Sequence, residues 1–146
     1  MTSKPPFFRQ ERFDTCALAC LRMLLAHYGR AATEAELILA TAMEEGGVDI
    51  EELARVAQRC SLRAEVQELS LDALAELVAQ ERFPIVYLNR FPLDAQFAIH
   101  AVIPVRFTRH YVTILDPRLG ERRVSQRQFE AARRYLSFCG VVCDPI

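Results

Sequence analysis

The sequence lacks tryptophan, a long hydrophobic run and an excess of charge of either sign. Its 18 basic residues nearly balance 19 acidic ones, which gives a net charge of −1. This balance argues against nucleic acid or an anionic membrane as a partner. The longest apolar run, from Ala17 to Ala26, contains Arg22 and is too short to span a bilayer. We therefore expect a protein without direct membrane insertion.

The N-terminus and the cysteines argue against three further classes. Residues 1–6 lack the apolar core of a signal peptide, so a cytoplasmic location is the default expectation. The cysteines are five, an odd number, and widely spaced, which argues against a disulfide framework. Cys16 and Cys20 would make half a zinc site, but no nearby pair of ligands completes it. The sequence predicts no metal and no cofactor.

The hydrophobic pattern predicts a single domain over residues 1–146, with helices first and strands later. No repeat, low-complexity segment or linker divides the chain. The predicted helices are Thr15 to Tyr28, Thr33 to Thr41, Asp49 to Arg59, Ser70 to Gln80 and Ser125 to Arg134. The predicted strands are Arg63 to Leu69, Phe83 to Leu88, Ala98 to Val105, Tyr111 to Asp116 and Leu136 to Cys143. This order indicates an α+β fold with a mainly antiparallel sheet. The Gly46-Gly47 pair is interpreted as a turn between two helices.

Cys16 stands at the start of the long apolar helix that ends at Gly29. A helix N-terminus presents unpaired N–H groups and a partial positive charge, and both favour a thiolate over a thiol. Because the thiolate is the nucleophile of cysteine enzymes, Cys16 is the candidate nucleophile. A buried structural thiol is the alternative, since free cysteines are often buried. Cys20, one turn further along, is assigned to the core.

Of the three histidines, only His100 lies inside a strongly apolar strand. A hairpin turn centred near Thr108 would place residue 100 opposite residue 116, with both side chains on the same face of the sheet. Asp116 could then fix the tautomer of His100 and stabilise its imidazolium. The alternatives are a core histidine with a backbone partner, and an aspartate that only begins an Asp-Pro turn.

Gln10 precedes Cys16 by six residues. Its side-chain amide is a candidate donor to an oxyanion, together with the backbone N–H of Cys16. A solvated loop glutamine is the simpler interpretation when Gln10 is taken alone. Gln10 is therefore an oxyanion-donor candidate only in combination with the other candidate residues.

The segment from Gln10 to Cys16, with the apolar helix that follows, resembles the start of the peptidase C39 family of bacteriocin-processing, double-glycine leader peptidases. The stretch from His100 to Asp116 resembles that family's His-to-Asp-Pro region, and the resemblance extends along nearly the whole chain. It implies a papain-like cysteine peptidase fold, with N-terminal helices packed on an antiparallel sheet. It also implies a catalytic triad of Cys16, His100 and Asp116, with Gln10 in the oxyanion hole.

The resemblance further implies hydrolysis of a peptide bond after a Gly-Gly site in a leader peptide, through a thioester acyl-enzyme. Most such domains form the N-terminus of an ABC transporter, and here we expect any transporter to be supplied by another chain. Ala17 and Ala101 stand where the family commonly has a glycine and an aromatic residue. Two alternatives stay open: a leader-binding module that does not cleave, against which the presence of Cys16 argues, and an acyltransferase that passes the thioester to an amine.

Overall fold

The computed structural model describes residues 3–41 and 47–146, and a six-stranded sheet forms its centre. The strands follow the order β1-β6-β2-β3-β4-β5, and each is antiparallel to its neighbours. They are β1 (Leu62–Glu68), β2 (Ile85–Asn89), β3 (Ile99–Phe107), β4 (Tyr111–Asp116), β5 (Gly120–Ser125) and β6 (Cys139–Pro145). The helices are α1 (Cys16–His27), α2 (Glu34–Leu39), α3 (Ile50–Arg59), α4 (Leu71–Ala79), α5 (Phe91–Asp94) and α6 (Gln126–Arg134). The predicted α+β class with an antiparallel sheet is confirmed.

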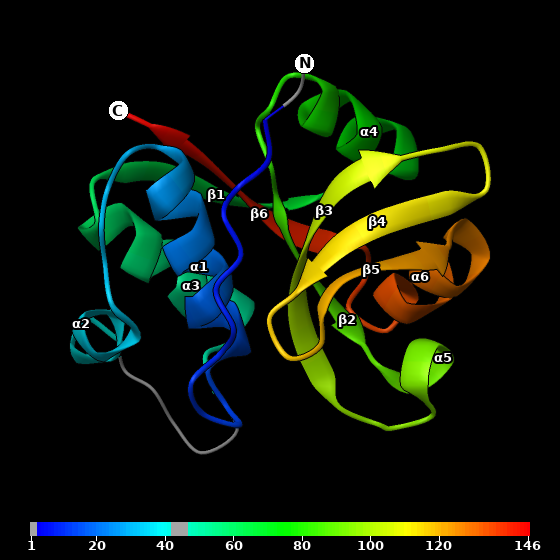
Figure 1. Cartoon of the computed structure of the whole chain (residues 1–146), viewed down its shortest axis with the longest axis horizontal. Coiled ribbons are helices and arrows are strands. Elements are labelled where there is room, and N and C mark those ends of the chain that lie inside the picture. Colours follow the sequence, from blue (N-terminus) through cyan, green and yellow to red (C-terminus); the bar gives the residue numbers. More distant parts are fainter. Residues whose placement is uncertain (1–2, 42–46) are drawn as a thin grey trace.

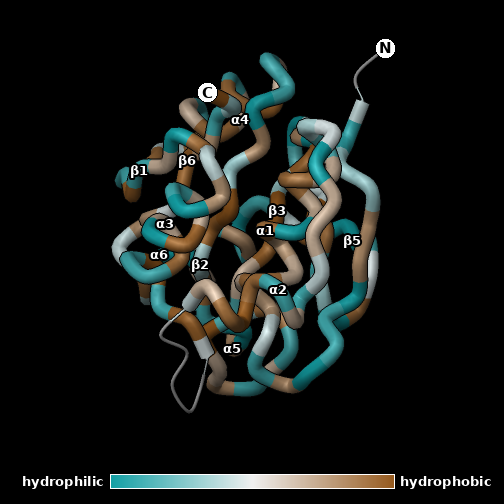
Figure 2. The backbone as a smooth tube through the Cα atoms, turned by 90° about the vertical axis from the view of Figure 1, so that its left-hand side faces the viewer, coloured by the Kyte–Doolittle hydropathy of each residue, from teal (hydrophilic) through white to brown (hydrophobic). Residues whose placement is uncertain are grey.

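Helices cover both faces of the sheet. Successive side chains along a strand point to opposite faces, and an apolar core forms on each face. Ala101 and Ile103 of β3 belong to the larger core, which also contains the apolar sides of α1 and α3. Val102, between them, belongs to a second core together with Phe129 of α6. In Figure 1, α1, α2 and α3 lie on one side of the molecule and β3, β4 and β5 on the other. Apolar stretches gather around α1, β2 and β3 in the interior (Figure 2).

Helix α1 is buried along almost its whole length, as its apolar circumference predicts. The residues of α1 that are buried are Ala17, Leu18, Ala19, Cys20, Leu21, Met23, Leu24 and Leu25. The helix ends before Gly29, whose φ of +77° is a conformation that glycine adopts without strain. No helix within the described ranges is long and apolar enough to cross a membrane.

Four helices begin where side-chain capping predicts. Thr33 and Glu36 form a reciprocal capping box at α2. The side chains of Asp49, Ser70 and Ser125 each accept a hydrogen bond from the backbone N–H three residues later, at the starts of α3, α4 and α6. Each cap satisfies a backbone N–H that would otherwise be unpaired. The capping side chains therefore mark the helix starts in the sequence.

Three parts of the fold differ from the expectation. Strand β5 was not predicted because its sequence, Gly-Glu-Arg-Arg-Val-Ser, contains one apolar residue and lies at the edge of the sheet. Helix α5 was not predicted either, since it has only four residues and a proline in its first turn. The closing strand begins at Cys139 rather than Leu136, because Ser137 and Phe138 have positive φ angles, 56° and 59°, and form a turn. Of the predicted Gly46-Gly47 turn, Gly46 lies outside the described residues.

Candidate active site

A cleft of about 280 Å³ is lined by residues that lie far apart in the sequence, from Gln10 to Arg118. Gln10 and Cys16 line it from the N-terminal segment and α1, Tyr87 from β2, and His100 from the start of β3. Gly47 also lines the cleft, and a Cβ atom there would lie 2.8 Å from the backbone oxygen of Asp14. The sequence had placed Cys16, His100 and Gln10 at one site, and the structure brings the three together.

Behind the cleft, His100 is paired with a carboxylate. Its Nε2 lies 2.7 Å from Oδ1 of Asp116, and both residues are buried, with exposed fractions of 5% and 1%. The same carboxylate oxygen accepts hydrogen bonds from the backbone N–H groups of Arg118 and Leu119, at 2.9 and 3.3 Å. Asp116 therefore begins a turn, as the Asp-Pro pair indicated, and also holds the imidazole. The two interpretations of Asp116 were not exclusive.

The predicted register of the β3–β4 hairpin was wrong, although its consequence for the two side chains holds. Ile103 pairs with Leu115, so residues 100 and 116 are diagonal neighbours rather than directly opposite. Near the turn, Phe107 pairs with Val112, and this register alone would put His100 and Asp116 on opposite faces of the sheet. The register shift between Pro104 and Arg106 moves the pairing by one residue and returns both to the same face. The irregularity in β3 thus makes the His100–Asp116 contact possible.

The electrostatics of the pair favour a protonated imidazole. Burial lowers the pKa of His100, but its hydrogen bonds to Asp116 and Cys16, together with the charges of those two groups, raise it to about 9. Burial raises the pKa of the Asp116 carboxyl, but the hydrogen bond and charge of His100 and the two backbone N–H groups bring it below its ordinary value. At neutral pH the arrangement is an imidazolium held by a carboxylate. Because Nε2 faces Asp116, Nδ1 is the ring nitrogen left for Cys16.

Cys16 is the first residue of α1 and is partly exposed in the cleft. The preceding Thr15 makes no capping hydrogen bond with its side chain. Its hydroxyl instead pairs with the backbone of Arg12, accepting from N–H at 3.1 Å and donating to the carbonyl oxygen at 3.0 Å. The backbone N–H groups in the first turn of α1, next to the Cys16 thiol, are therefore not occupied by the Thr15 side chain.

Gln10 lies in the cleft but directs its amide protons to its own loop. Its Nε2 donates to the carbonyl oxygens of Arg12 and Phe13, at 2.8 and 3.2 Å, while its Oε1 is buried without a partner. The backbone N–H of Gln10 donates to the oxygen of Pro117, just after Asp116. This contact joins the loop before Cys16 to the turn that contains the Asp116 carboxylate.

The other four cysteines occupy different environments. Cys20 and Cys143 are buried, and burial raises the pKa of both thiols, that of Cys143 to about 12. Cys60 is partly exposed, and burial again raises its pKa. Cys139 is partly exposed as well. Within residues 3–41 and 47–146, no group of three or more His, Cys, Asp or Glu side chains is placed to hold a metal ion.

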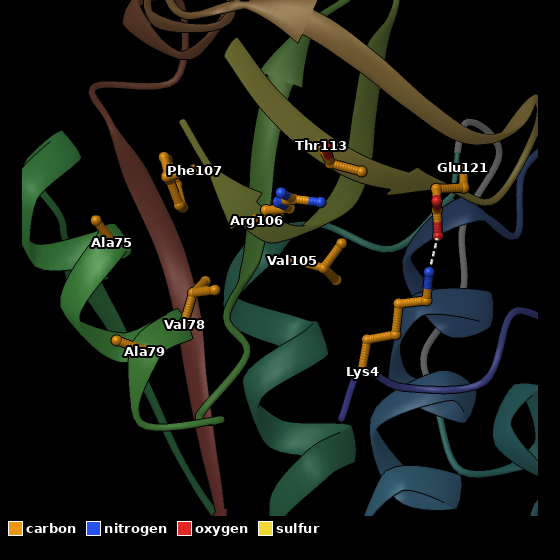
Figure 3. A pocket seen from close by; sticks show the side chains of 9 residues that line it. All are labelled: Lys4, Ala75, Val78, Ala79, Val105, Arg106, Phe107, Thr113 and Glu121. Atoms are coloured by element: carbon orange, nitrogen blue, oxygen red, sulfur yellow. Dashed lines mark hydrogen bonds and ion pairs between the residues drawn. The ribbon is translucent and has the colours of Figure 1, made fainter. Parts of the chain in front are cut away.

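A second cavity, of about 610 Å³, lies between α4 and strands β3 and β4 (Figure 3). Its apolar wall includes Val78 and Val105, and an ion pair between Lys4 and Glu121 lies at its edge. It contains no cysteine or histidine, and it shares no lining residue with the cleft around Cys16. Among the residues that the structure describes, the only cysteine or histidine side chains that line either of these two cavities are thus those of Cys16 and His100 in the smaller cleft.

The profile of the Peptidase C39 family matches residues 4–135 of the chain. The chain belongs to the peptidase C39 family. This confirms the resemblance drawn from the segment around Cys16 and from the stretch between His100 and Asp116. A search among curated proteins gave no match.

Solved structures show that this C39 chain has the papain-like fold of other C39 peptidase domains. A double glycine motif protease from an AMS/PCAT transporter, in complex with the leader peptide, is 17% identical with a TM-score of 0.77, and the match covers 99% of this chain and 94% of that one. The peptidase domain of Streptococcus ComA, a bi-functional ABC transporter, is 16% identical with a TM-score of 0.81, covering 95% and 97%. A C39-like peptidase from Bacillus anthracis is 17% identical with a TM-score of 0.81, covering 97% and 94%. At such identities the likeness shows the fold alone.

Proposed function

We propose that this C39 chain is a cysteine peptidase that uses Cys16 as nucleophile, His100 as acid and base, and Asp116 as the group that orients His100. The observation that supports this most is the buried His100–Asp116 contact of 2.7 Å beside a thiol at a helix N-terminus in the same cleft. We place the activity in one domain, residues 1–146. No metal or cofactor has a role in it.

In this mechanism the Cys16 thiolate attacks the carbonyl carbon of the scissile bond. The backbone N–H of Cys16 and Nε2 of Gln10 stabilise the oxyanion, and for this Gln10 releases one of the two loop carbonyls that it now contacts. The imidazolium of His100 gives a proton to the leaving amine as the C–N bond breaks, which leaves a thioester on Cys16. His100 then takes a proton from water, which attacks the thioester and releases the acid.

The walls of the cleft favour small residues before the scissile bond. The hydroxyl of Tyr87 donates to the carbonyl oxygen of Val48 at 2.7 Å and fixes this wall, and Gly47 packs directly against the loop that precedes Cys16. A rigid wall excludes larger side chains by steric repulsion. This selectivity requires no additional attractive contact with the preferred small residue. We therefore propose a substrate that is cleaved after a Gly-Gly pair, in agreement with the double glycine motif of the similar protease.

An exposed apolar stripe is the proposed docking surface for the leader. It consists of Ile99, which lines the cleft, and of Phe97, Phe91 and Tyr135 beyond it. The rings of Phe91 and Phe97 are stacked at 4.4 Å, and Phe97 meets Tyr135 edge-on at 6.3 Å. An amphipathic helix laid on such a stripe would supply the affinity that a narrow scissile site lacks. The partner is then a leader peptide, and we propose a cytoplasmic domain that serves an ABC transporter.

A peptide panel tests the substrate. Four peptides share one apolar helical leader and differ only before the scissile bond, with Gly-Gly, Gly-Ala, Ala-Ala or Leu-Leu. We expect the highest kcat/KM for Gly-Gly, a value lower by about 10-fold or more for Gly-Ala, and no cleavage of Leu-Leu, because each added carbon meets the fixed wall. Products are located by mass spectrometry. Equal cleavage of all four, or cleavage of Leu-Leu alone, contradicts the double-glycine specificity.

A further inference from the structure

Behind Asp116, three more charged side chains continue a line of alternating charge that begins at His100. Oδ2 of Asp116 lies 3.5 Å from Nη1 of Arg122. Arg122 donates two hydrogen bonds to Asp94, from Nη1 to Oδ2 at 3.2 Å and from Nη2 to Oδ1 at 3.0 Å. Nε of Arg90 lies 3.4 Å from Oδ2 of Asp94. The line ends at Arg90, which lines the same cleft as His100.

The topology of the sheet fixes this line. Ile114 pairs with Arg122 and Asp116 with Gly120 in the β4–β5 ladder, so Arg122 and Asp116 are diagonal neighbours on one face. The side chains of Arg122 and Asp94 are mostly buried, with exposed fractions of 23% and 17%. Solvent and salt screen such pairs less than they screen exposed ones. Nη1 of Arg122 thus contacts both carboxylates, and Nη2 adds a second hydrogen bond to Asp94.

We propose that Arg122 is a positioning residue of this peptidase, which holds the second carboxylate oxygen of Asp116 and limits how strongly Asp116 attracts the proton of His100. Asp94 fixes Arg122 in this place and joins it to the cleft wall at Arg90. The catalytic meaning of this role rests on the proposed function, but the electrostatic coupling itself does not. The bidentate contact with Asp94 uses the planar guanidinium, whereas the effect on Asp116 depends on the positive charge, which lysine keeps.

Ionisable groups on five elements form the line or lie close to it. They are Cys16 and Cys20 on α1, Arg90 and Asp94 at α5, His100 on β3, Asp116 on β4 and Arg122 on β5. Burial raises the pKa of Asp94, but the hydrogen bonds and charges of Arg122 and Arg90 lower it below its ordinary value, so Asp94 is ionised at neutral pH. Neutralising Arg122 or Asp94 thus changes the charge near Asp116 by one unit, with opposite signs.

The sign of each change follows from the charge removed. Arg122→Met takes a cation away from Asp116, so the imidazolium of His100 is more stable and its proton leaves at higher pH than in the wild type, where the pKa is about 9. Asp94→Asn frees Arg122 to act on Asp116 alone, so the proton of His100 leaves at lower pH. Arg122→Lys keeps the charge, and the pKa stays near the wild-type value. If Arg122 and Asp94 had purely structural roles, their two variants would not shift the pKa of His100 in opposite directions.

The experiment is an NMR titration of the imidazole of His100 in the full chain, with His100→Gln used to assign its signal among the three histidines. We expect the pKa of His100 to rise by about one half to one unit in Arg122→Met and to fall in Asp94→Asn. In peptide hydrolysis, kcat of Arg122→Met should fall while KM stays within about twofold, since Arg122 does not line the cleft.

Unchanged His100 pKa values in both variants, or shifts of the same sign, overturn the proposal. Because the titration needs no turnover, its result is independent of whether the chain is a peptidase. If Arg122→Met does not fold, Arg122→Lys and Asp94→Asn decide: a pKa near the wild-type value in the first and a lowered one in the second support the coupling, and any other pair of results contradicts it.

Discussion

Cys16→Ala is expected to reduce peptide turnover by about 10⁵-fold or more, because no other group in the cleft can form the thioester. Cys16 is only partly buried, so its removal leaves the core intact. The measurement is the single-turnover rate of cleavage of the Gly-Gly peptide, with circular dichroism to confirm the fold. Turnover retained in Cys16→Ala would contradict the mechanism as a whole.

Cys20→Ala is the matched control. Cys20 lies one turn further along α1, is fully buried, and donates a weak hydrogen bond from its thiol to the oxygen of Ala101 at 3.5 Å. Its replacement removes one buried sulfur and should cost about 1 kcal/mol of the free energy of unfolding, while turnover stays near the wild-type value. Loss of turnover in both variants would point to a general effect on α1 and not to a nucleophile.

Changes in the His100–Asp116 pair are expected to have the next largest effects. His100→Ala removes both the group that protonates the leaving amine and the charge beside Cys16, and turnover should be lost nearly as completely as in Cys16→Ala. Asp116→Asn should lower kcat by roughly 10²- to 10⁴-fold, because an amide carries no negative charge with which to stabilise the imidazolium.

The asparagine variant separates orientation from folding. Oδ1 of Asp116 accepts hydrogen bonds from the N–H groups of Arg118 and Leu119, and the amide oxygen of asparagine can accept the same two bonds. The turn and the fold should therefore survive, which circular dichroism and thermal unfolding would show. Wild-type kcat in Asp116→Asn would remove Asp116 from the mechanism and leave it as a turn residue.

The sequence predicted those features that depend on local patterns. The apolar circumference of α1 indicated a buried helix, and capping side chains such as Thr33 and Asp49 located the starts of later helices. The position of Cys16 at a helix start is likewise local, so the candidate nucleophile needed no tertiary information. His100 drew attention because an imidazole in an apolar strand needs a partner.

The features that the sequence did not predict depend on distant contacts. The register shift between Pro104 and Arg106 leaves no distinct pattern in the sequence, yet without it His100 and Asp116 would face opposite sides of the sheet. Arg122 lies in a strand that looks like a polar loop, so its contact with Asp116 was not anticipated. The loop hydrogen bonds of Gln10 were likewise not anticipated, and they make its role the least direct of the four site residues.

The central claim is that Cys16 is the activated nucleophile, and selective alkylation tests it most directly. The native chain is exposed briefly to iodoacetamide near neutral pH, quenched and digested, and the modified cysteine is located by mass spectrometry. Burial raises the pKa of Cys20, Cys60 and Cys143, which keeps those three thiols protonated and slow to react. The partly exposed Cys139 is the internal reference. We expect Cys16 to be modified first, and more slowly in His100→Ala; modification of Cys139 or Cys60 first, with Cys16 unmodified, would contradict the account.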